Sequence, residues 1–227
     1  FIPMRGGSKR LPRKNLAELG GMKICHRVLS AAIESECFDK IIVSTDDEEI
    51  AQVALNLGAN VPFIRPANLA LDATESAPVI IHALKHMEIK KNCKYDAVMM
   101  LQPTSPLRSV SNINQALDLF SSQACDSVVS VISVGGNHPF RMKRLVGNQL
   151  INYIDQGFWD MRPRQILPPA YIRNGAIYLI NRNIFLKNEM LIGEHCLGLK
   201  MSDEESVNID TRLDFIVAEL LLKEQNS

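Results

Sequence analysis

The sequence has no long apolar run, no excess of one charge and no closely paired cysteines. No stretch approaches the roughly 20 apolar residues of a membrane-spanning helix, and no secretory signal pattern is visible. Lysine and arginine together number 25, as do aspartate and glutamate, so no overall field attracts a polyanion or a lipid surface. We therefore expect neither nucleic acid nor a membrane among the partners.

The cysteines and histidines exclude two further classes of protein. Five cysteines are scattered along the chain without a C-x-x-C pair: Cys25, Cys37, Cys93, Cys125 and Cys196. This pattern favours reduced thiols in a cytoplasmic protein over a disulfide framework or a zinc site. The five histidines form no cluster with metal-ligand spacing, so we assign none of them to chemistry.

The chain does contain an alternation of strand and helix patterns. Runs of β-branched or apolar residues at 41–44, 97–101 and 128–134 are typical of strands, with helical spacing between them. Such alternation predicts βαβ units, and 227 residues suit one α/β domain. We expect a three-layer, Rossmann-like nucleotide-binding sandwich with a mostly parallel sheet, spanning residues 1–227. Ligands of such sheets gather beyond the carboxyl ends of the strands.

Three stripes of apolar residues at helical spacing predict amphipathic helices that face the core. Their members are Ile50, Val53, Ala54 and Leu57; Ala77, Ile80, Ile81, Leu84 and Met87; and Leu213, Ile216, Val217 and Leu220. The segment Thr45-Asp-Asp-Glu48 resembles a capping box that would open the first helix. The third helix is expected to close the fold.

The most informative segment is the loop at residues 4–15, MRGGSKRLPRKN, which follows an apparent strand. Backbone N–H groups at Gly6 and Gly7 can approach an anion closely. Five cations can neutralise its charges: Arg5, Lys9, Arg10, Arg13 and Lys14. The spacing matches neither a Walker loop nor G-x-G-x-x-G. A solvated surface turn is the alternative, but the position directly after a strand favours a polyphosphate site.

This loop and three later motifs resemble the acylneuraminate cytidylyltransferases, the CMP-sialic acid synthetases, and their bacterial nonulosonate relatives. The loop is similar to the nucleotide-binding signature of that family, and Leu101-Gln-Pro-Thr-Ser-Pro-Leu-Arg108 is similar to its second signature. The sugar-site segment is matched by Pro163-Arg-Gln and by Asn174-Gly-Ala-Ile-Tyr178. The metal-binding end is matched by Ser206-Val-Asn-Ile-Asp-Thr211 followed by Leu213-Asp214. Four motifs in the family's order are far more specific than any one of them.

The resemblance implies transfer of CMP from CTP to the anomeric hydroxyl of a nonulosonic acid of N-acylneuraminate type, with release of pyrophosphate. Arg5 and Lys14 are then expected to contact the phosphates, and the nucleotide would be held by Gly6, Gly7, Ser8 and Asn15. Lys9, Arg10 and Arg13 are left out, because five cations cannot all face one triphosphate. Legionaminic, pseudaminic and 3-deoxy-octulosonic acid are alternative acceptors. A relative that binds nucleotide without turnover is a further alternative.

The same resemblance implies Mg²⁺ as the cofactor, held by Asp210, which we also count as catalytic. Mg²⁺ prefers oxygen ligands and takes one or two carboxylates plus substrate phosphates. The family typically has D-[IV]-D here, whereas this chain has Asn208-Ile209-Asp210. Asn208 is therefore an expected neutral ligand, and the number of ions stays open. Asp210 could instead cap the last helix, and Asp214 is an outer candidate ligand or a helix-surface carboxylate.

The sugar side of the site is expected from six residues: Ser76, Gln102, Arg141, Arg164, Asn174 and Tyr178. The guanidinium of Arg164 would fit the sugar carboxylate in a bidentate manner, and Arg141 is a second cation. Tyr178 could equally pack in the core, and Ser76 could simply begin a helix.

Residues 135–170 do not read as a βαβ unit. They contain Gly135-Gly136 and a proline-braced stretch between Met161 and Pro169. In the resembling family this region is an arm that embraces a second subunit and completes the partner's sugar site. The resemblance therefore implies a homodimer, and a long surface insertion is the alternative.

Overall fold

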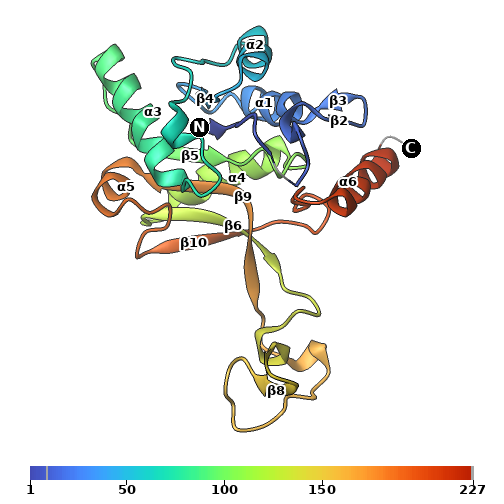
Figure 1. Cartoon of the computed structure of the whole chain (residues 1–227). Helices are drawn as coiled ribbons and strands as arrows, with labels where there is room; N and C mark the ends of the chain where they lie inside the picture. The colour runs from blue at the N-terminus through green and yellow to red at the C-terminus, as the bar shows by residue number, and fades with distance from the viewer. Residues whose placement is uncertain (9, 226–227) are drawn as a thin grey trace.

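The computed structural model describes residues 1–8 and 10–225, and its centre is a twisted sheet (Figure 1). Four strands pair in the order β10-β6-β9-β5: β5 (Ala97–Leu101), β6 (Ser127–Ser133), β9 (Tyr171–Asn181) and β10 (Cys196–Lys200). Two short strands, β1 (Ile2–Pro3) and β4 (Val43–Ser44), pair in parallel and continue this layer beside β5. The backbone N–H of Leu101 donates to the carbonyl oxygen of Phe1 at 3.0 Å, which joins β5 to the chain at β1.

The sheet is mixed, which corrects the expectation of a mostly parallel one. Strand β9 runs antiparallel to both of its neighbours, β5 and β6, while β10 is parallel to β6. The cause is the connection between β6 and β9. Parallel neighbours need a crossover, usually a helix, whereas here the chain leaves the sheet after β6 and returns at the same end. Hydrophobic runs identify strands but carry no information about their direction.

Helices cover both faces of the sheet, so the expected three layers are present. On one face lie α1 (Ile24–Glu34), α2 (Glu48–Asn56) and α4 (Val110–Ser122); on the other lie α3 (Ser76–Lys91) and α5 (Arg182–Asn188). Strand β5 shows the division. Met99 and Leu101 belong to the cluster around α1 and α4, whereas Val98 and Met100 pack with residues of α3 and α5. This alternation is the period of two that strands impose on their side chains.

The first two predicted helices occur where their stripes indicated. Ile50 and Ala54 are buried in α2, and α3 buries Ala77, Ile80, Leu84 and Met87. The cap of α2 lies at the third residue of the expected capping box: the side chain of Asp47 accepts a hydrogen bond from the Ile50 N–H at 3.0 Å. Helix α4 begins with a full capping box formed by Ser109 and Asn112.

The last helix, α6 (Arg212–Gln225), forms as expected but buries the opposite face. The predicted stripe is exposed, with 68% of Leu213 and 55% of Leu220 accessible to solvent. The buried residues are instead Phe215, Ala218 and Leu222. They pack with Leu19 of the small hairpin formed by β2 (Glu18–Leu19) and β3 (Met22–Lys23). The prediction was wrong because α6 carries apolar residues on two faces, and only docking decides which one is covered.

Residues 135–170 project from the body of the molecule, as Figure 1 shows below the sheet, and we call them the protruding segment. The segment contains the antiparallel hairpin β7 (Lys143–Val146) and β8 (Gln149–Asn152), and two 3-10 turns, η3 (Pro139–Arg141) and η4 (Arg164–Ile166). Many of its large apolar side chains are exposed, including those of Leu145, Val146, Tyr153, Phe158, Trp159, Met161 and Ile166. Within residues 1–8 and 10–225, no helix is both long and apolar enough to cross a bilayer.

The two faces of α6 give a testable prediction. Replacing Phe215 with alanine removes a ring that is only 6% exposed and should lower the free energy of unfolding by about 3 kcal/mol. The matched change Leu213→Ala removes an exposed side chain and should alter it by less than about 0.5 kcal/mol. Urea denaturation measures both values. Equal losses would mean that the helix docks through its other face.

Candidate functional site

A polar cavity of about 260 Å³ lies where β1 and β5 end. Its walls come from segments that are far apart in the sequence. The end of β1 contributes Pro3, and the loop after it contributes Arg5, Ser8, Lys14 and Asn15. The start of α3 and the residues before it contribute Thr74, Glu75, Ser76 and Val79, and the turn after β5 contributes Gln102, Pro103 and Thr104. Arg65 and Asp210 complete the lining. The first, second and fourth sequence motifs therefore meet in one cavity.

A direct contact joins the first motif to the last. The ammonium of Lys14 donates to the Asp210 carboxylate at 3.0 Å and to the carbonyl oxygen of Ile209 at 2.6 Å. The Lys14 side chain is only 12% exposed, so this ion pair is partly shielded from water. In turn, the Ile209 N–H donates to the carbonyl oxygen of Thr104 at 2.6 Å. The loop before α6 is thus held against both the basic loop and the turn after β5.

The basic loop is shaped by two close contacts. Asn15 is buried, and its amide donates to the carbonyl oxygen of Arg5 at 2.8 Å, so it closes the loop. A Cβ atom at Gly6 would lie 2.7 Å from a carboxylate oxygen of Asp47, so only glycine fits there. Gly7 has open space around its Cα atom. The N–H of Gly6 donates to the Asp46 carboxylate at 2.9 Å. The backbone donor that we expected to bind phosphate is therefore engaged by a carboxylate of the protein.

The described cations of the loop differ in their surroundings. Arg5 and Lys14 line the cavity. Arg13 instead pairs with Glu49 at 2.6 Å on an exposed surface, and Arg10 is exposed. Lys9 lies outside the described residues.

Arg65 is a cavity residue that the sequence analysis missed. It is 6% exposed, and its guanidinium donates to the hydroxyl of Ser44 at 2.9 Å and to the Ser44 carbonyl oxygen. Burial lowers the pKa of Arg65, and the charge of Asp46 partly opposes this shift. Its proximity to the site follows from tertiary structure alone, because Arg65 stands in a stretch without a recognisable motif. It adds a third cation to Arg5 and Lys14.

The turn after β5 is supported from beneath by a buried arginine. Arg108 is 4% exposed and donates to the carbonyl oxygen of Ala176 at 2.8 Å and, more weakly, to that of Gln102 at 3.4 Å. Burial lowers the pKa of Arg108 to about 9, so the side chain still carries its charge at neutral pH. Arg108 therefore anchors Gln102 against β9, while the Gln102 side chain lines the cavity.

Asp210 does not cap α6, because two other residues do so. The Asp214 carboxylate accepts from the backbone N–H groups of Asp210 and Thr211, at 3.0 and 2.6 Å, and the Thr211 hydroxyl accepts from the Asp214 N–H at 3.3 Å. Burial raises the pKa of Asp214, but these hydrogen bonds outweigh it and lower the pKa below its ordinary value. Asp214 is thus a capping residue, and the capping alternative for Asp210 was wrong.

Oxygen donors for a divalent ion are present at the Asp210 wall. The Asp210 side chain is 43% exposed, and the Asn208 amide donates to its second oxygen at 3.0 Å. Among the described residues, no group of three His, Cys, Asp or Glu side chains gathers. One carboxylate and one amide still suit Mg²⁺, which usually completes its shell with phosphate oxygens and water.

Two predicted sugar contacts have structural roles in β9. Asn174 is buried, and its amide oxygen accepts from the Ser130 hydroxyl at 2.6 Å, while its nitrogen donates to the Ser206 hydroxyl at 2.9 Å. Its hydrogen-bonding groups are therefore engaged within the protein. Tyr178 packs with the cluster that contains Ala77 and Leu191, in agreement with its core alternative. Both residues lie outside the described lining of the cavity.

Two predicted cations lie in the protruding segment, away from this cavity. Arg141 donates to the carbonyl oxygen of Arg162 at 2.6 Å, and Arg164 is exposed at η4. Within the part of the chain that the structure describes, neither belongs to the cavity lining. Of the six predicted sugar contacts, Ser76 and Gln102 do line it.

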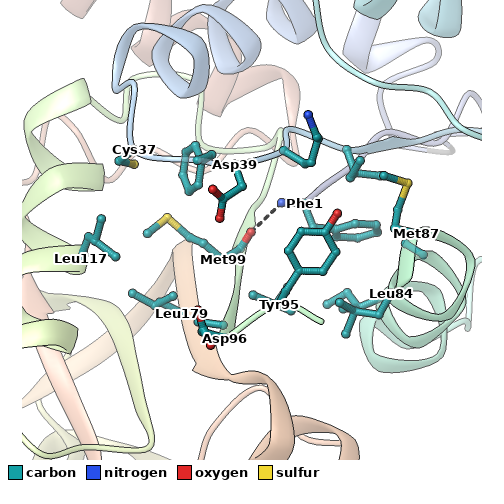
Figure 2. Close-up of a pocket in the computed structure, with 17 residues that line it drawn as sticks. Phe1, Cys37, Asp39, Leu84, Met87, Tyr95, Asp96, Met99, Leu117 and Leu179 are labelled. Atoms are coloured by element: carbon teal, nitrogen blue, oxygen red, sulfur yellow. Dashed lines mark hydrogen bonds between the residues drawn. The ribbon is translucent and has the colours of Figure 1, made fainter. Parts of the chain in front are cut away.

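A second cavity of about 240 Å³ lies at the opposite edge of the sheet, before β4 and β5 begin. Figure 2 shows its walls, where Leu84, Met87, Tyr95, Met99 and Leu179 surround a mainly apolar space. Among the described residues, it shares no lining with the polar cavity. Its lining lacks the cluster of cations that a polyphosphate requires, so the polar cavity is the candidate site.

Comparison with known proteins agrees with this geometry. Residues 1–155 match the model of a protein family described as cytidylyltransferase. The chain belongs to this family. The match covers the basic loop and the turn after β5, which both line the cavity.

Similar proteins place the chain among the CMP-nonulosonate synthetases, as the four motifs predicted. It is 33% identical to CMP-N,N'-diacetyllegionaminic acid synthase of Legionella pneumophila, over 98% of this chain and 94% of that protein. It is 32% identical to post-translational flagellin modification protein B of Campylobacter coli, over 99% of this chain and 94% of that protein. N-acylneuraminate cytidylyltransferase of Escherichia coli is also 32% identical, but this chain covers only 52% of its length.

Solved structures support the fold of this cytidylyltransferase. The structure of CMP:2-keto-3-deoxy-manno-octonic acid synthetase complexed with CTP superimposes with a TM-score of 0.69. The likeness covers 99% of this chain and 97% of that one, at 16% identity. The shared fold is therefore an α/β fold with a mixed sheet.

The capping carboxylate of α6 gives a second prediction. Asp214→Asn should lower the free energy of unfolding by about 1 kcal/mol, because the capping hydrogen bonds are weakened. The sign with pH follows from the lowered pKa of Asp214. Its contribution is present above the ordinary value of 3.8 and is lost as the pH falls below it. Thermal melts between pH 3 and pH 7, about one unit apart, would measure this; a loss for Asp214→Asn that is the same at every pH contradicts the assignment.

Proposed function

We propose that the protein transfers CMP from CTP to the anomeric hydroxyl of a nonulosonic acid and releases pyrophosphate. The observation that carries this proposal is the single cavity shared by Arg5, Lys14 and Asp210. Membership of the cytidylyltransferase family supports the nucleotide, and the names of the relatives support an acidic sugar as acceptor.

The chemistry requires positioning and charge neutralisation. The sugar hydroxyl attacks the α-phosphorus in line, the bond to the β-phosphate oxygen breaks, and pyrophosphate leaves. Negative charge increases on oxygens that Arg5 and Lys14 would contact, and removing one preorganised donor from a developing charge typically costs about 10²- to 10³-fold in rate. Asn15 would hold the nucleotide through the loop that it closes, and Ser8 faces the same cavity.

Mg²⁺ is the cofactor that the donor set suits, with Asp210 as ligand and Asn208 as a neutral second donor. When bound, it would offset phosphate charge and hold the pyrophosphate oxygens. Lys14, which contacts Asp210, keeps the carboxylate at the cavity wall through its ion pair. A neutral amide at position 208 removes one negative charge from the pattern typical of the family, which favours weaker binding of the ion.

The acceptor would lie between Ser76, Gln102 and a cation that binds its carboxylate. Arg164 and Arg141 suit that carboxylate, but they lie outside the cavity of their own chain. We infer that the protruding segment of a second copy supplies them, so that the protein acts as a homodimer. The exposed apolar side chains of the segment support this inference, because monomers rarely expose so many together.

The acceptor is proposed to be of the N-acylneuraminate type, with legionaminic acid as the strongest alternative. Relatives named for both sugars have similar identity, 32% and 33%. Pseudaminic and 3-deoxy-octulosonic acid use the same carboxylate and anomeric hydroxyl, so the phosphate chemistry does not discriminate among them. A nucleotide-binding relative without turnover is disfavoured by the presence of Arg5, Lys14 and Asp210 in one site.

A pyrophosphate-release assay tests the proposal directly. The protein is mixed with Mg²⁺, each of the four nucleoside triphosphates and a panel of free sugar acids. We expect release with CTP and at least one nonulosonic acid, and much less with the other nucleotides. Release with no nucleotide and acid combination, from protein that binds CTP, would favour the non-catalytic alternative.

Mixing two inactive variants tests whether the site is shared between subunits. Arg164→Ala and Asp210→Asn should each reduce turnover strongly. If Arg164 acts on the partner's cavity, a mixed dimer keeps one intact site, and an equal mixture should recover about a quarter of wild-type activity. No recovery on mixing, despite subunit exchange shown by mass spectrometry, would place Arg164 and Asp210 in the same subunit's site or remove Arg164 from it.

A further inference from the structure

One of the two carboxylates that line the polar cavity is unpaired. Asp210 is paired with Lys14, whereas the other is Glu75, which lies where the loop after η2 (Ala67–Leu69) enters α3. Glu75 occupies the N-cap position of α3, but its side chain accepts no capping hydrogen bond. Within residues 1–8 and 10–225 it forms no ion pair either, although three cations line the same cavity.

An unpaired carboxylate restricts what can bind beside it. Its charge repels the phosphates of a nucleotide, and the acceptor sugar carries a carboxylate of its own. The nucleoside is the uncharged part of the proposed ligands. Because a carboxylate accepts hydrogen bonds and donates none, it suits a neutral group that presents N–H donors. The chemistry of Glu75 therefore fits the edge of a base better than a phosphate or an acidic sugar.

The surroundings of Glu75 suit a flat, largely apolar ring. Val79 lies about one helical turn after Glu75 and also lines the cavity, so the two side chains share one side of α3. Val79 is 4% exposed, and Pro3 adds apolar surface from the end of β1. The cations of the cavity come from other segments, the basic loop and Arg65. The α3 wall thus combines apolar surface with a hydrogen-bond acceptor, as recognition of a base requires.

We propose that Glu75 selects cytosine by accepting a hydrogen bond from its 4-amino group. This inference rests on the proposed function, because it takes the polar cavity as the CTP site. Cytosine presents an N–H donor at this position, whereas uracil presents a carbonyl oxygen. A carboxylate stabilises the first and repels the second. Since CTP and UTP carry the same ribose and phosphates, the basic loop cannot discriminate between them, and Glu75 can.

Nucleotide affinities measured without an acceptor sugar test this selection. In calorimetric titrations with Mg²⁺ present, wild type should bind CTP roughly tenfold more tightly than UTP, as a hydrogen-bonded base edge typically provides. Glu75→Gln should reduce this ratio to about twofold or less, because an amide can accept from cytosine and donate to uracil. An effect of charge on the phosphates would change both affinities equally. An unchanged ratio in Glu75→Gln would therefore overturn the proposal.

Glu48→Gln is the matched control. Glu48 is the first residue of α2, much as Glu75 directly precedes α3, and it is exposed and outside the described lining of the cavity. This variant should keep the wild-type ratio of CTP to UTP affinity, and thermal melts should show that both variants are folded. A similar loss of selectivity in the control would assign the effect to net charge and overturn the proposal.

A CTP analogue with hydrogen in place of the 4-amino group identifies the atom that Glu75 contacts. Wild type should bind the analogue roughly tenfold more weakly than CTP. In Glu75→Ala this difference should fall to about twofold or less, because the variant and the analogue remove the same contact. If Glu75→Ala discriminates between the two ligands as well as wild type does, the amino group binds elsewhere and the proposal is wrong.

The same titrations separate this proposal from the proposed function. Failure of the protein to bind any nucleoside triphosphate would overturn both. Selective binding of CTP that does not depend on Glu75 would overturn the base contact and leave the function intact. The expected changes in selectivity, combined with no pyrophosphate release, would support the base contact and remove only the proposed transfer reaction.

Discussion

The candidate site depends on the contact between Lys14 and the loop that ends at Asp210. Lys14 reaches both the Asp210 carboxylate and the Ile209 carbonyl oxygen, across 195 residues of sequence in the latter case. Because its side chain is only 12% exposed, the interaction is less screened than a surface ion pair. It ties the basic loop to the oxygen donors, and the hydrogen bond from Ile209 to Thr104 ties the same donors to the turn after β5.

The sheet explains why this contact can form. Strands β1 and β5 end at the same edge, which brings the basic loop beside the turn that holds Gln102. That turn is fastened from below by Arg108, whose hydrogen bond to Ala176 ties it to β9. The antiparallel direction of β9 matters here, because it places the start of the strand's core segment beneath the turn. The site therefore rests on strand ends and short buried hydrogen bonds, which define positions better than mobile side chains do.

Charges of both signs lie at the candidate site. Arg5, Lys14 and the buried Arg65 provide positive charge, while Asp72 and Asp210 offset it. The cations of the site are therefore partly neutralised by carboxylates of the chain itself. Asn208, which donates to Asp210, adds no charge of its own to this wall.

The sequence by itself determined the family and the three layers, and it predicted phosphate and metal candidates, because glycine, cation and carboxylate patterns are local and their chemistry is specific. It also located the strand β5 and the helices α2 and α3, because the spacing of their apolar residues fits only one type of secondary structure. Only the tertiary structure decided the direction of β9, the buried face of α6, the capping role of Asp214 and the presence of Arg65 in the cavity. These depend on docking between distant segments. The local sequence pattern around a residue is the same whichever distant segment packs against its side chain.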